Sequence, residues 1–256
     1  MLDDRYAVQQ RFAFWGAAEG QLHLGKSTAV VIGVGALGGT SANLLARAGV
    51  GRLRLVDPDY PSMNNLHRQI LYYETDIGAG IPKAEAAARN LRSANHDVCI
   101  EPVVAELKAT NARSLLDGAD VVIDGLDNMK SRYVLNEACH RMNIPWVHAA
   151  VVASRGQMMV IRPDRGPCLR CWSNQEDAEK STPLVSVHGV IGPTPLSLAA
   201  LQVNEALKLL LGAEEFLLEG LLKIDLWPPR FKTLEKKYLT NPECPVCNGK
   251  YEHIEF

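Results

Sequence analysis

The chain has 256 residues, with 27 lysines and arginines against 29 aspartates and glutamates, and a formal net charge of −2. Its composition, 47% hydrophobic and 22% charged, excludes a disordered or fibrous chain. The balanced, scattered charge argues against a nucleic-acid binder, and no apolar stretch is long enough for a membrane span. The N-terminal residues lack the order of a signal peptide, so the expected compartment is the cytoplasm.

The first 162 residues alternate between strand and helix patterns. In chain order we expect a strand over 28–34, a helix over 40–48, a strand over 52–56, a helix over 83–94, a strand over 98–104, a helix over 111–116, a strand over 119–124, a helix over 131–142, and strands over 146–150 and 157–161. Such alternation predicts an α/β fold with a doubly wound, mainly parallel, Rossmann-like sheet.

The remaining residues have a different pattern. A long loop over 163–193 precedes an apolar helix over 195–211, and segments 221–225 and 230–236 are expected to form a hairpin or edge strands. Because no Ser/Gly-rich linker divides the chain, we expect a single domain over 1–256. Within it we expect a strand–helix core over 1–162 and a C-terminal elaboration over 163–256.

A glycine-rich motif, Gly33-Val-Gly35-Ala36-Leu-Gly38, joins the first strand to the first helix. Glycines let the backbone approach a phosphate, and the following helix points its amides at the anion. Asp57 ends the next strand, where its carboxylate can accept ribose hydroxyls. The motif therefore predicts nucleotide binding, and the alternative is a turn that serves only close helix–sheet packing.

Polar residues follow the second strand, in the stretch Asn64-Asn65-Leu-His67-Arg68-Gln69 and at Lys83. This connection lies on the carboxyl side of the sheet, where open α/β folds bind ligands. A triphosphate needs an arginine and a lysine there to neutralise its charge, whereas a dinucleotide does not. The alternative is a solvated loop.

Asp127 and Asn128 follow a buried strand that ends at Asp124. The carboxylate of Asp127 is a candidate ligand for Mg²⁺ beside the phosphates. The alternative is that Asp127 caps the next helix, and Asn128 is also an ordinary capping residue.

The six cysteines include two C-x-x-C pairs, Cys168/Cys171 and Cys244/Cys247. Four thiolates suffice for a closed tetrahedral zinc site, which we favour over a redox pair. Cys99 and Cys139 lie in apolar segments and are expected to be buried.

Together these residues resemble the HesA/MoeB/ThiF family of adenylating enzymes, which is related to ubiquitin activation. The resemblance rests on Arg5-Tyr6, the glycine motif, Ala48-Gly49-Val50-Gly51, Asp57-Pro58-Asp59, Asn65 to Gln69, Pro82-Lys83, Asp127-Asn128 and both cysteine pairs. It implies ATP-dependent adenylation of the C-terminal glycine carboxylate of a small ubiquitin-fold sulfur carrier protein ending in Gly-Gly, with release of pyrophosphate. It also implies a homodimer.

The resemblance implies a role for particular side chains. Asp57 resembles the ribose ligand, Arg68 and Lys83 the groups that stabilise the transition state, and Asp127 the residue that organises Mg²⁺. The full set of implied nucleotide contacts is Gly33, Gly35, Ala36, Gly38, Asp57, Asp59, Asn65, Arg68, Gln69, Lys83, Asp127 and Asn128. The four paired cysteines match structural zinc ligands.

The sequence departs from the family pattern in three places. The common Arg-Tyr-x-Arg-Gln is replaced by residues 5–11, so Arg11 becomes the candidate for the arginine that reaches a partner's active site. The spacing from Arg68 to Lys83 is slightly longer than usual. Before Gly189-Val190, Val185 or a neighbour replaces a common cysteine, which predicts adenylation only, with sulfur supplied by another protein.

Three alternatives remain open from the sequence. A dinucleotide-dependent oxidoreductase explains the glycines and Asp57 but gives Arg68, Lys83 and Asp127 no role. A peptide in natural-product biosynthesis could replace the carrier as the acceptor. A zinc-stabilised scaffold without catalytic activity is the third.

Overall fold

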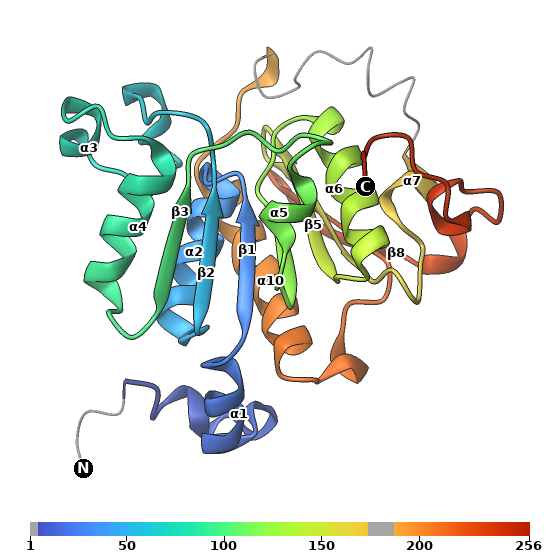
Figure 1. Ribbon diagram of the computed structural model, residues 1–256, viewed down its shortest axis with the longest axis horizontal. Coiled ribbons are helices and arrows are strands. Elements are labelled where there is room, and N and C mark those ends of the chain that lie inside the picture. Colours follow the sequence, from blue (N-terminus) through green and yellow to red (C-terminus); the bar gives the residue numbers. More distant parts are fainter. Residues whose placement is uncertain (1–4, 174–186) are drawn as a thin grey trace.

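The computed structural model describes residues 5–173 and 187–256. Its centre is one sheet in the strand order β3-β2-β1-β4-β5-β6-β7-β8 (Figure 1). The strands are β1 Thr28–Ile32, β2 Arg52–Val56, β3 Cys99–Val103, β4 Val121–Asp124, β5 Trp146–Val152, β6 Arg155–Ile161, β7 Leu221–Leu226 and β8 Pro229–Leu234. Neighbours from β3 through β5 pair in parallel, and β6, β7 and β8 continue the sheet antiparallel.

Helices cover both faces of this sheet. The α-helices are α1 Ala17–Leu24, α2 Ala36–Ala48, α3 Glu74–Gly78, α4 Lys83–Ala94, α5 Ala112–Leu116, α6 Met129–Met142, α7 Leu169–Trp172 and α10 Pro193–Leu210. Helices α2, α4 and α10 contribute to the core on one face, and α5 and α6 to the core on the other. Within β1, Val31 packs into the first core and Val30 into the second, which explains the continuous apolar run.

The order of the strands fixes where a ligand has access to the sheet. From β1 the chain winds outward through β2 and β3, then crosses back to place β4 on the other side of β1. The carboxyl ends of β1 and β4 therefore meet at a topological switch point, the usual ligand crevice of such sheets. The predicted doubly wound, mainly parallel fold is confirmed.

Several local expectations need adjustment. Helix α2 begins directly after Gly35, and α6 begins after Asn128 caps it, so both start earlier than the apolar pattern indicates. The expected hairpin is confirmed as the antiparallel pair β7 and β8. Cys139 is buried as expected, but the prediction for Cys99 is wrong: it is exposed, because it opens the edge strand β3.

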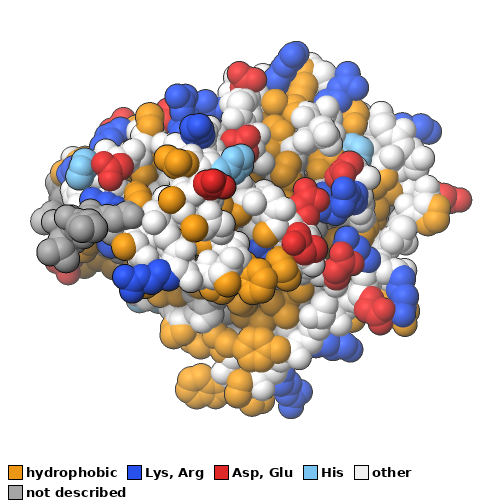
Figure 2. All heavy atoms as spheres, turned by 90° about the horizontal axis from the view of Figure 1, so that it is seen from below, with side chains coloured by type: hydrophobic (Ala, Val, Ile, Leu, Met, Phe, Trp, Pro, Cys, Tyr) orange, Lys and Arg blue, Asp and Glu red, His pale blue; other side chains and the backbone are white. Residues whose placement is uncertain are grey.

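The N-terminal segment lies at the amino ends of the central strands, below the sheet in Figure 1. Exposed hydrophobic side chains gather on this underside (Figure 2), and the N-terminal segment contributes Val8, Phe12 and Phe14 to them. The rings of Phe12 and Phe14 are 5.6 Å apart. Among the described residues, no helix has the length and apolarity to cross a bilayer.

Candidate active site and metal centre

The glycine motif brings three backbone segments into direct contact. Gly33 has a φ of 83°, in the left-handed region that favours glycine. A Cβ on Gly38 would lie 1.8 Å from the Gly33 carbonyl oxygen, and one on Gly125 would lie 2.1 Å from the same atom. These glycines are required for packing. Gly35 differs, because a Cβ there would have only Gln69 Nε2 nearby, at 3.7 Å. The open side of the turn is therefore at Gly35.

This contrast predicts two different outcomes for alanine substitution. Gly38→Ala places a methyl group against the Gly33 carbonyl oxygen, so this substitution is expected to prevent stable folding. Gly35→Ala is expected to keep the thermal unfolding midpoint within a few degrees, while the methyl group obstructs a phosphate and weakens ATP binding by about tenfold or more. Calorimetric titration with ATP beside thermal unfolding tests both. A Gly35→Ala protein with unchanged ATP affinity would contradict this assignment.

Asp57 is held beside the glycine turn at the end of β2. Its carboxylate accepts hydrogen bonds from the Val34 amide at 2.7 Å and from the Asp59 amide at 2.9 Å. Burial raises the pKa of Asp57, and the charge of Lys83 offsets part of that rise. The two backbone contacts fix the carboxylate at the edge where the sequence predicted a ribose ligand.

Lys83 opens helix α4 and lies against the same turn. Its side chain is 8% exposed, and its ammonium group is 3.1 Å from Asp59 Oδ2. The Lys83 amide also donates to the Asp59 carbonyl at 2.8 Å, so side chain and backbone are both anchored to this residue. The buried Tyr72 hydroxyl donates to the Val34 carbonyl at 2.6 Å. A cation is thus fixed close to the glycine motif.

The segment after Asn64 supplies a second cation and a buried amide. Arg68 donates from Nη1 to the Asn64 carbonyl at 2.8 Å, and its partial burial lowers its pKa. Gln69 is 6% exposed, and its Oε1 has no hydrogen-bond partner among the described residues. Buried polar atoms are nearly always satisfied, so this carboxamide beside Gly35 fits a site that receives a polar ligand.

Asp127 and Asn128 divide the roles that the sequence left open. The Asn128 side chain accepts from the Ser131 amide at 2.9 Å and caps α6. The carboxylate of Asp127 is exposed, and within residues 5–173 and 187–256 its one hydrogen bond is accepted from Asn128 Nδ2, at 3.2 Å. It is therefore available for a cation.

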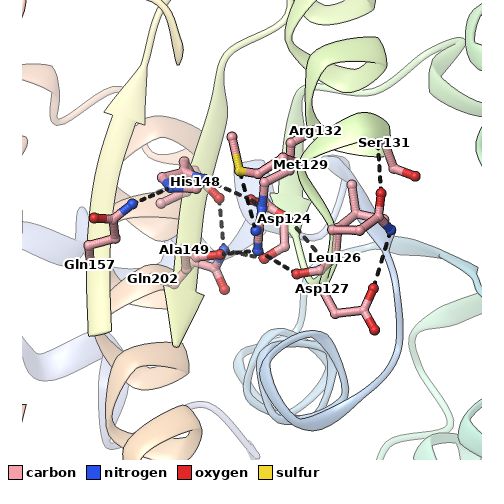
Figure 3. A network of polar contacts seen from close by, with 12 residues as sticks. Asp124, Leu126, Asp127, Met129, Ser131, Arg132, His148, Ala149, Gln157 and Gln202 are labelled. Carbon is pink, nitrogen blue, oxygen red and sulfur yellow. Dashed lines mark hydrogen bonds and ion pairs between the residues drawn. The ribbon is translucent and has the colours of Figure 1, made fainter. Parts of the chain in front are cut away.

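A buried polar network around Asp124 lies beside Asp127 (Figure 3). Asp124 Oδ2 accepts from Arg132 Nε at 2.9 Å and contacts His148 Nδ1 at 2.8 Å. Gln202 of α10 donates to the Asp124 carbonyl at 3.0 Å. Burial would raise the pKa of Asp124, but Arg132 and His148 outweigh it and lower that pKa. Sequence reasoning missed this network.

His148 predicts a pH dependence of stability. Burial lowers its pKa below the ordinary 6.5, so below that pH the unfolded chain binds a proton that the folded chain does not. The free energy of unfolding, measured by urea denaturation, is therefore expected to fall as the pH drops from 8 to 5.5. His148 contributes at most about 1.4 kcal/mol per pH unit to this fall. His148→Gln should flatten this slope, leaving the part due to His140, whose pKa burial also lowers. Substituting the exposed His23, which forms no ion pair among the described residues, is the matched control.

The two cysteine pairs form one cluster, although 73 positions separate Cys171 from Cys244 in the sequence. Their four sulfurs lie within 4.8 Å of one another. Measured separations are 3.6 Å between Cys168 and Cys244, 3.4 Å between Cys171 and Cys247, and 3.8 Å within the first pair. Zinc with bonds of about 2.3 Å separates tetrahedral sulfurs by about 3.8 Å. The cluster therefore fits zinc.

Comparison with known proteins assigns this arrangement to a family. The model of the family described as ThiF family matches residues 6–246. The chain belongs to the ThiF family. It is 41% identical over 238 residues to SAMP-activating enzyme E1 of Haloferax volcanii, covering 93% of this chain and 86% of that protein.

Two further similarities extend this result. The ThiF-family chain is 38% identical over 247 residues to the sulfur carrier protein ThiS adenylyltransferase of Bacillus subtilis, covering 96% of this chain and 72% of that one. A crystal structure of E. coli MccB with succinimide superposes with a TM-score of 0.80 at 22% identity, over 96% of this chain and 74% of that one. At this identity the superposition shows a shared fold.

In this ThiF-family fold most predicted nucleotide contacts lie at the carboxyl ends of β1, β2 and β4 or in the connections that follow them. Arg11 does not join them. It lies in the short 3₁₀ helix Gln9–Arg11, and Gln9 binds the Ala48 carbonyl where α2 ends, at the opposite edge of the sheet. Arg5 pairs with Asp97 at 3.6 Å. Val185 lies outside the described residues.

Proposed function

We propose that this chain adenylates the C-terminal glycine carboxylate of a small ubiquitin-fold sulfur carrier protein, with ATP as the donor and pyrophosphate as the leaving group. The observation that carries the proposal is a fixed, buried lysine beside a glycine turn that is open only at Gly35. Two relatives named above support it, since one is a ThiS adenylyltransferase and the other a SAMP-activating enzyme. A 36% identical Thermus thermophilus relative is a sulfur carrier protein adenylyltransferase.

The reaction needs charge neutralisation more than proton transfer. An oxygen of the carrier's carboxylate attacks the α-phosphorus of ATP, and the bond from that phosphorus to the bridging oxygen breaks to release pyrophosphate. The carboxylate is already ionised at neutral pH, so no general base is required. Lys83 and Arg68 neutralise the phosphate oxygens as charge moves onto the leaving group, and fixed cations do this without reorganisation.

Other residues hold the nucleotide. The Asp57 carboxylate accepts hydrogen bonds from the ribose hydroxyls. When the nucleotide binds, it supplies the hydrogen-bond donor that Gln69 Oε1 lacks among the described residues. Asp127 would hold Mg²⁺, since its exposed carboxylate has no cationic partner among the described residues. That ion would supply further neutralisation of the triphosphate. Zinc held by four cysteines has no open position, so its role is structural.

We further propose that the enzyme is a homodimer and that it catalyses adenylation alone. Arg11 lies far from its own chain's glycine turn, which supports a homodimer in which it reaches the partner's site. Valine at position 185, in place of a cysteine, supports adenylation alone, with sulfur supplied by another protein. Helix α10 packs on α2 and β5, which supports one domain over 1–256.

Exchange of labelled pyrophosphate into ATP tests the function directly. With Mg²⁺ and a carrier ending in Gly-Gly, we expect exchange that depends on the carrier and is absent when its last glycine is deleted. A peptide acceptor forms a second arm of the same assay. No exchange with any acceptor, together with tight binding of NADH, would replace this proposal by the oxidoreductase alternative.

A further inference from the structure

One buried ion pair binds both the amide and the carbonyl of Leu126, the residue before Asp127. The Leu126 amide donates to Asp124 Oδ1 at 2.9 Å, and the Leu126 carbonyl accepts from Arg132 Nη2 (Figure 3). Asp124 ends β4 and Arg132 lies in the first turns of α6, so the pair spans the loop that carries Asp127. We refer to Asp124 and Arg132 as the clamp.

The clamp is rigid because its polar atoms are satisfied inside the protein. Asp124 is fully buried and Arg132 is 5% exposed. Besides Leu126, the Arg132 guanidinium binds Asp124 through Nε at 2.9 Å and the Ala149 carbonyl through Nη2 at 3.0 Å. A shift of either side chain would leave a buried charge unpaired, which is strongly unfavourable.

His148 and Gln157 extend the network away from the loop. His148 Nδ1 lies 2.8 Å from Asp124 Oδ2, and Gln157 Nε2 lies 3.4 Å from His148 Nε2. A neutral histidine protonated on Nδ1 satisfies both contacts, because it donates to the carboxylate and accepts from the amide. Arg132 therefore supplies the positive charge that balances Asp124.

We propose that Arg132, held by Asp124, is a positioning residue that fixes the carboxylate of Asp127 for adenylation. This inference rests on the proposed function, in which Asp127 organises the cation at the phosphates. A single peptide bond joins the clamped Leu126 to Asp127, so rotation of that peptide moves the carboxylate. A displacement of about 1 Å at a reacting group is sufficient to lower a rate about 10²-fold.

Arg132→Lys is the informative substitution. Lysine keeps a positive charge beside Asp124, which protects the fold, but one ammonium cannot hold Asp124, Leu126 and Ala149 together. The matched control is Glu137→Gln on the same helix. Glu137 is 4% exposed, and its Oε2 accepts from the amides of Glu252 and His253, away from the loop.

Hydrogen exchange of the Leu126 amide tests the clamp without any activity measurement. We expect this amide to exchange about tenfold or more faster in Arg132→Lys than in the parent, and at the parental rate in Glu137→Gln. An unchanged Leu126 rate in Arg132→Lys overturns the inference, even if the protein catalyses pyrophosphate exchange.

A double-mutant cycle separates positioning from general destabilisation. Arg132→Lys is expected to lower kcat for pyrophosphate exchange about 10²-fold in the parent, but less than threefold when Asp127 is already alanine. Equal losses in both backgrounds would mean that Arg132 acts independently of Asp127 and would overturn the inference. A parent without exchange activity would refute the proposed function, and the Leu126 amide would then decide whether the clamp exists.

Discussion

Lys83→Met is expected to lower the rate of carrier-dependent pyrophosphate exchange by about 10²–10³-fold, the range found when one preorganised electrostatic group is removed from an active site. Methionine preserves the buried stem of the side chain but removes the ammonium group that lies 3.1 Å from Asp59. The β- and γ-phosphates then lose a fixed cation, and the carboxylates of Asp57 and Asp59 repel the nucleotide. Both binding of ATP and kcat should suffer.

Steady-state exchange at saturating ATP and direct titration of ATP separate the two effects. Lys26→Met is the control, because Lys26 is exposed between α1 and β1 at the amino edge of the sheet. It should retain parental kinetics. If Lys83→Met kept full exchange activity while remaining folded, the buried lysine would serve only to balance Asp57 and Asp59, and the proposed mechanism would lose its principal cation.

Removal of metal by a chelator is expected to lower the thermal unfolding midpoint by about 8–16 °C. Zinc present at about a thousand times its dissociation constant stabilises the fold by about 4 kcal/mol. In a protein of this size each kcal/mol corresponds to about 2–4 °C. The effect is large because the cluster joins the start of α7 to the C-terminal tail. Cys168 from the first segment and Cys244 from the second are both buried in the same core.

Elemental analysis should find one zinc per chain. Cys247→Ser should lose it and reproduce the chelated midpoint, whereas Cys99→Ser should retain both metal and midpoint, since Cys99 lies exposed on β3. A metal-free protein that unfolds at the same temperature as the parent would assign the four cysteines to another role. Pyrophosphate exchange measured below the lowered midpoint should persist, because the cluster holds no open position for a reactant.

Local patterns in the sequence were sufficient for the central fold. The β-branched run that forms β1 is buried on both faces, as an uninterrupted apolar strand requires, and the glycines that follow it fit only a tight strand-to-helix turn. Both are short-range features, so neighbouring residues encode them. The cysteine pairs were equally informative, since the preferences of zinc depend on the type and number of its ligands rather than on their separation in the chain.

Helix caps marked the limit of local reasoning. An Asp-Asn pair before a helix allows either residue to act as the cap. Asn128 has that role because its backbone is extended and its side chain accepts from the Ser131 amide. The Asp127 carboxylate is thereby left without a cationic partner among the described residues. The sequence offered one usable signal for the clamp: Asp124 ends a buried strand, and a buried carboxylate requires a partner. It did not indicate which of several arginines provides it.

The amino-acid sequence by itself determined the α/β class, the phosphate-type turn and the capacity to bind zinc, because each depends on residue type and close spacing. Tertiary structure alone decided that Gln69 faces Gly35, that Gln202 and His148 support Asp124, and that Arg11 lies at the edge opposite the glycine turn. These contacts join residues from distant elements, and burial selects their partners. Physical proximity in the folded chain, which no local pattern encodes, therefore distinguishes the site from its individual motifs.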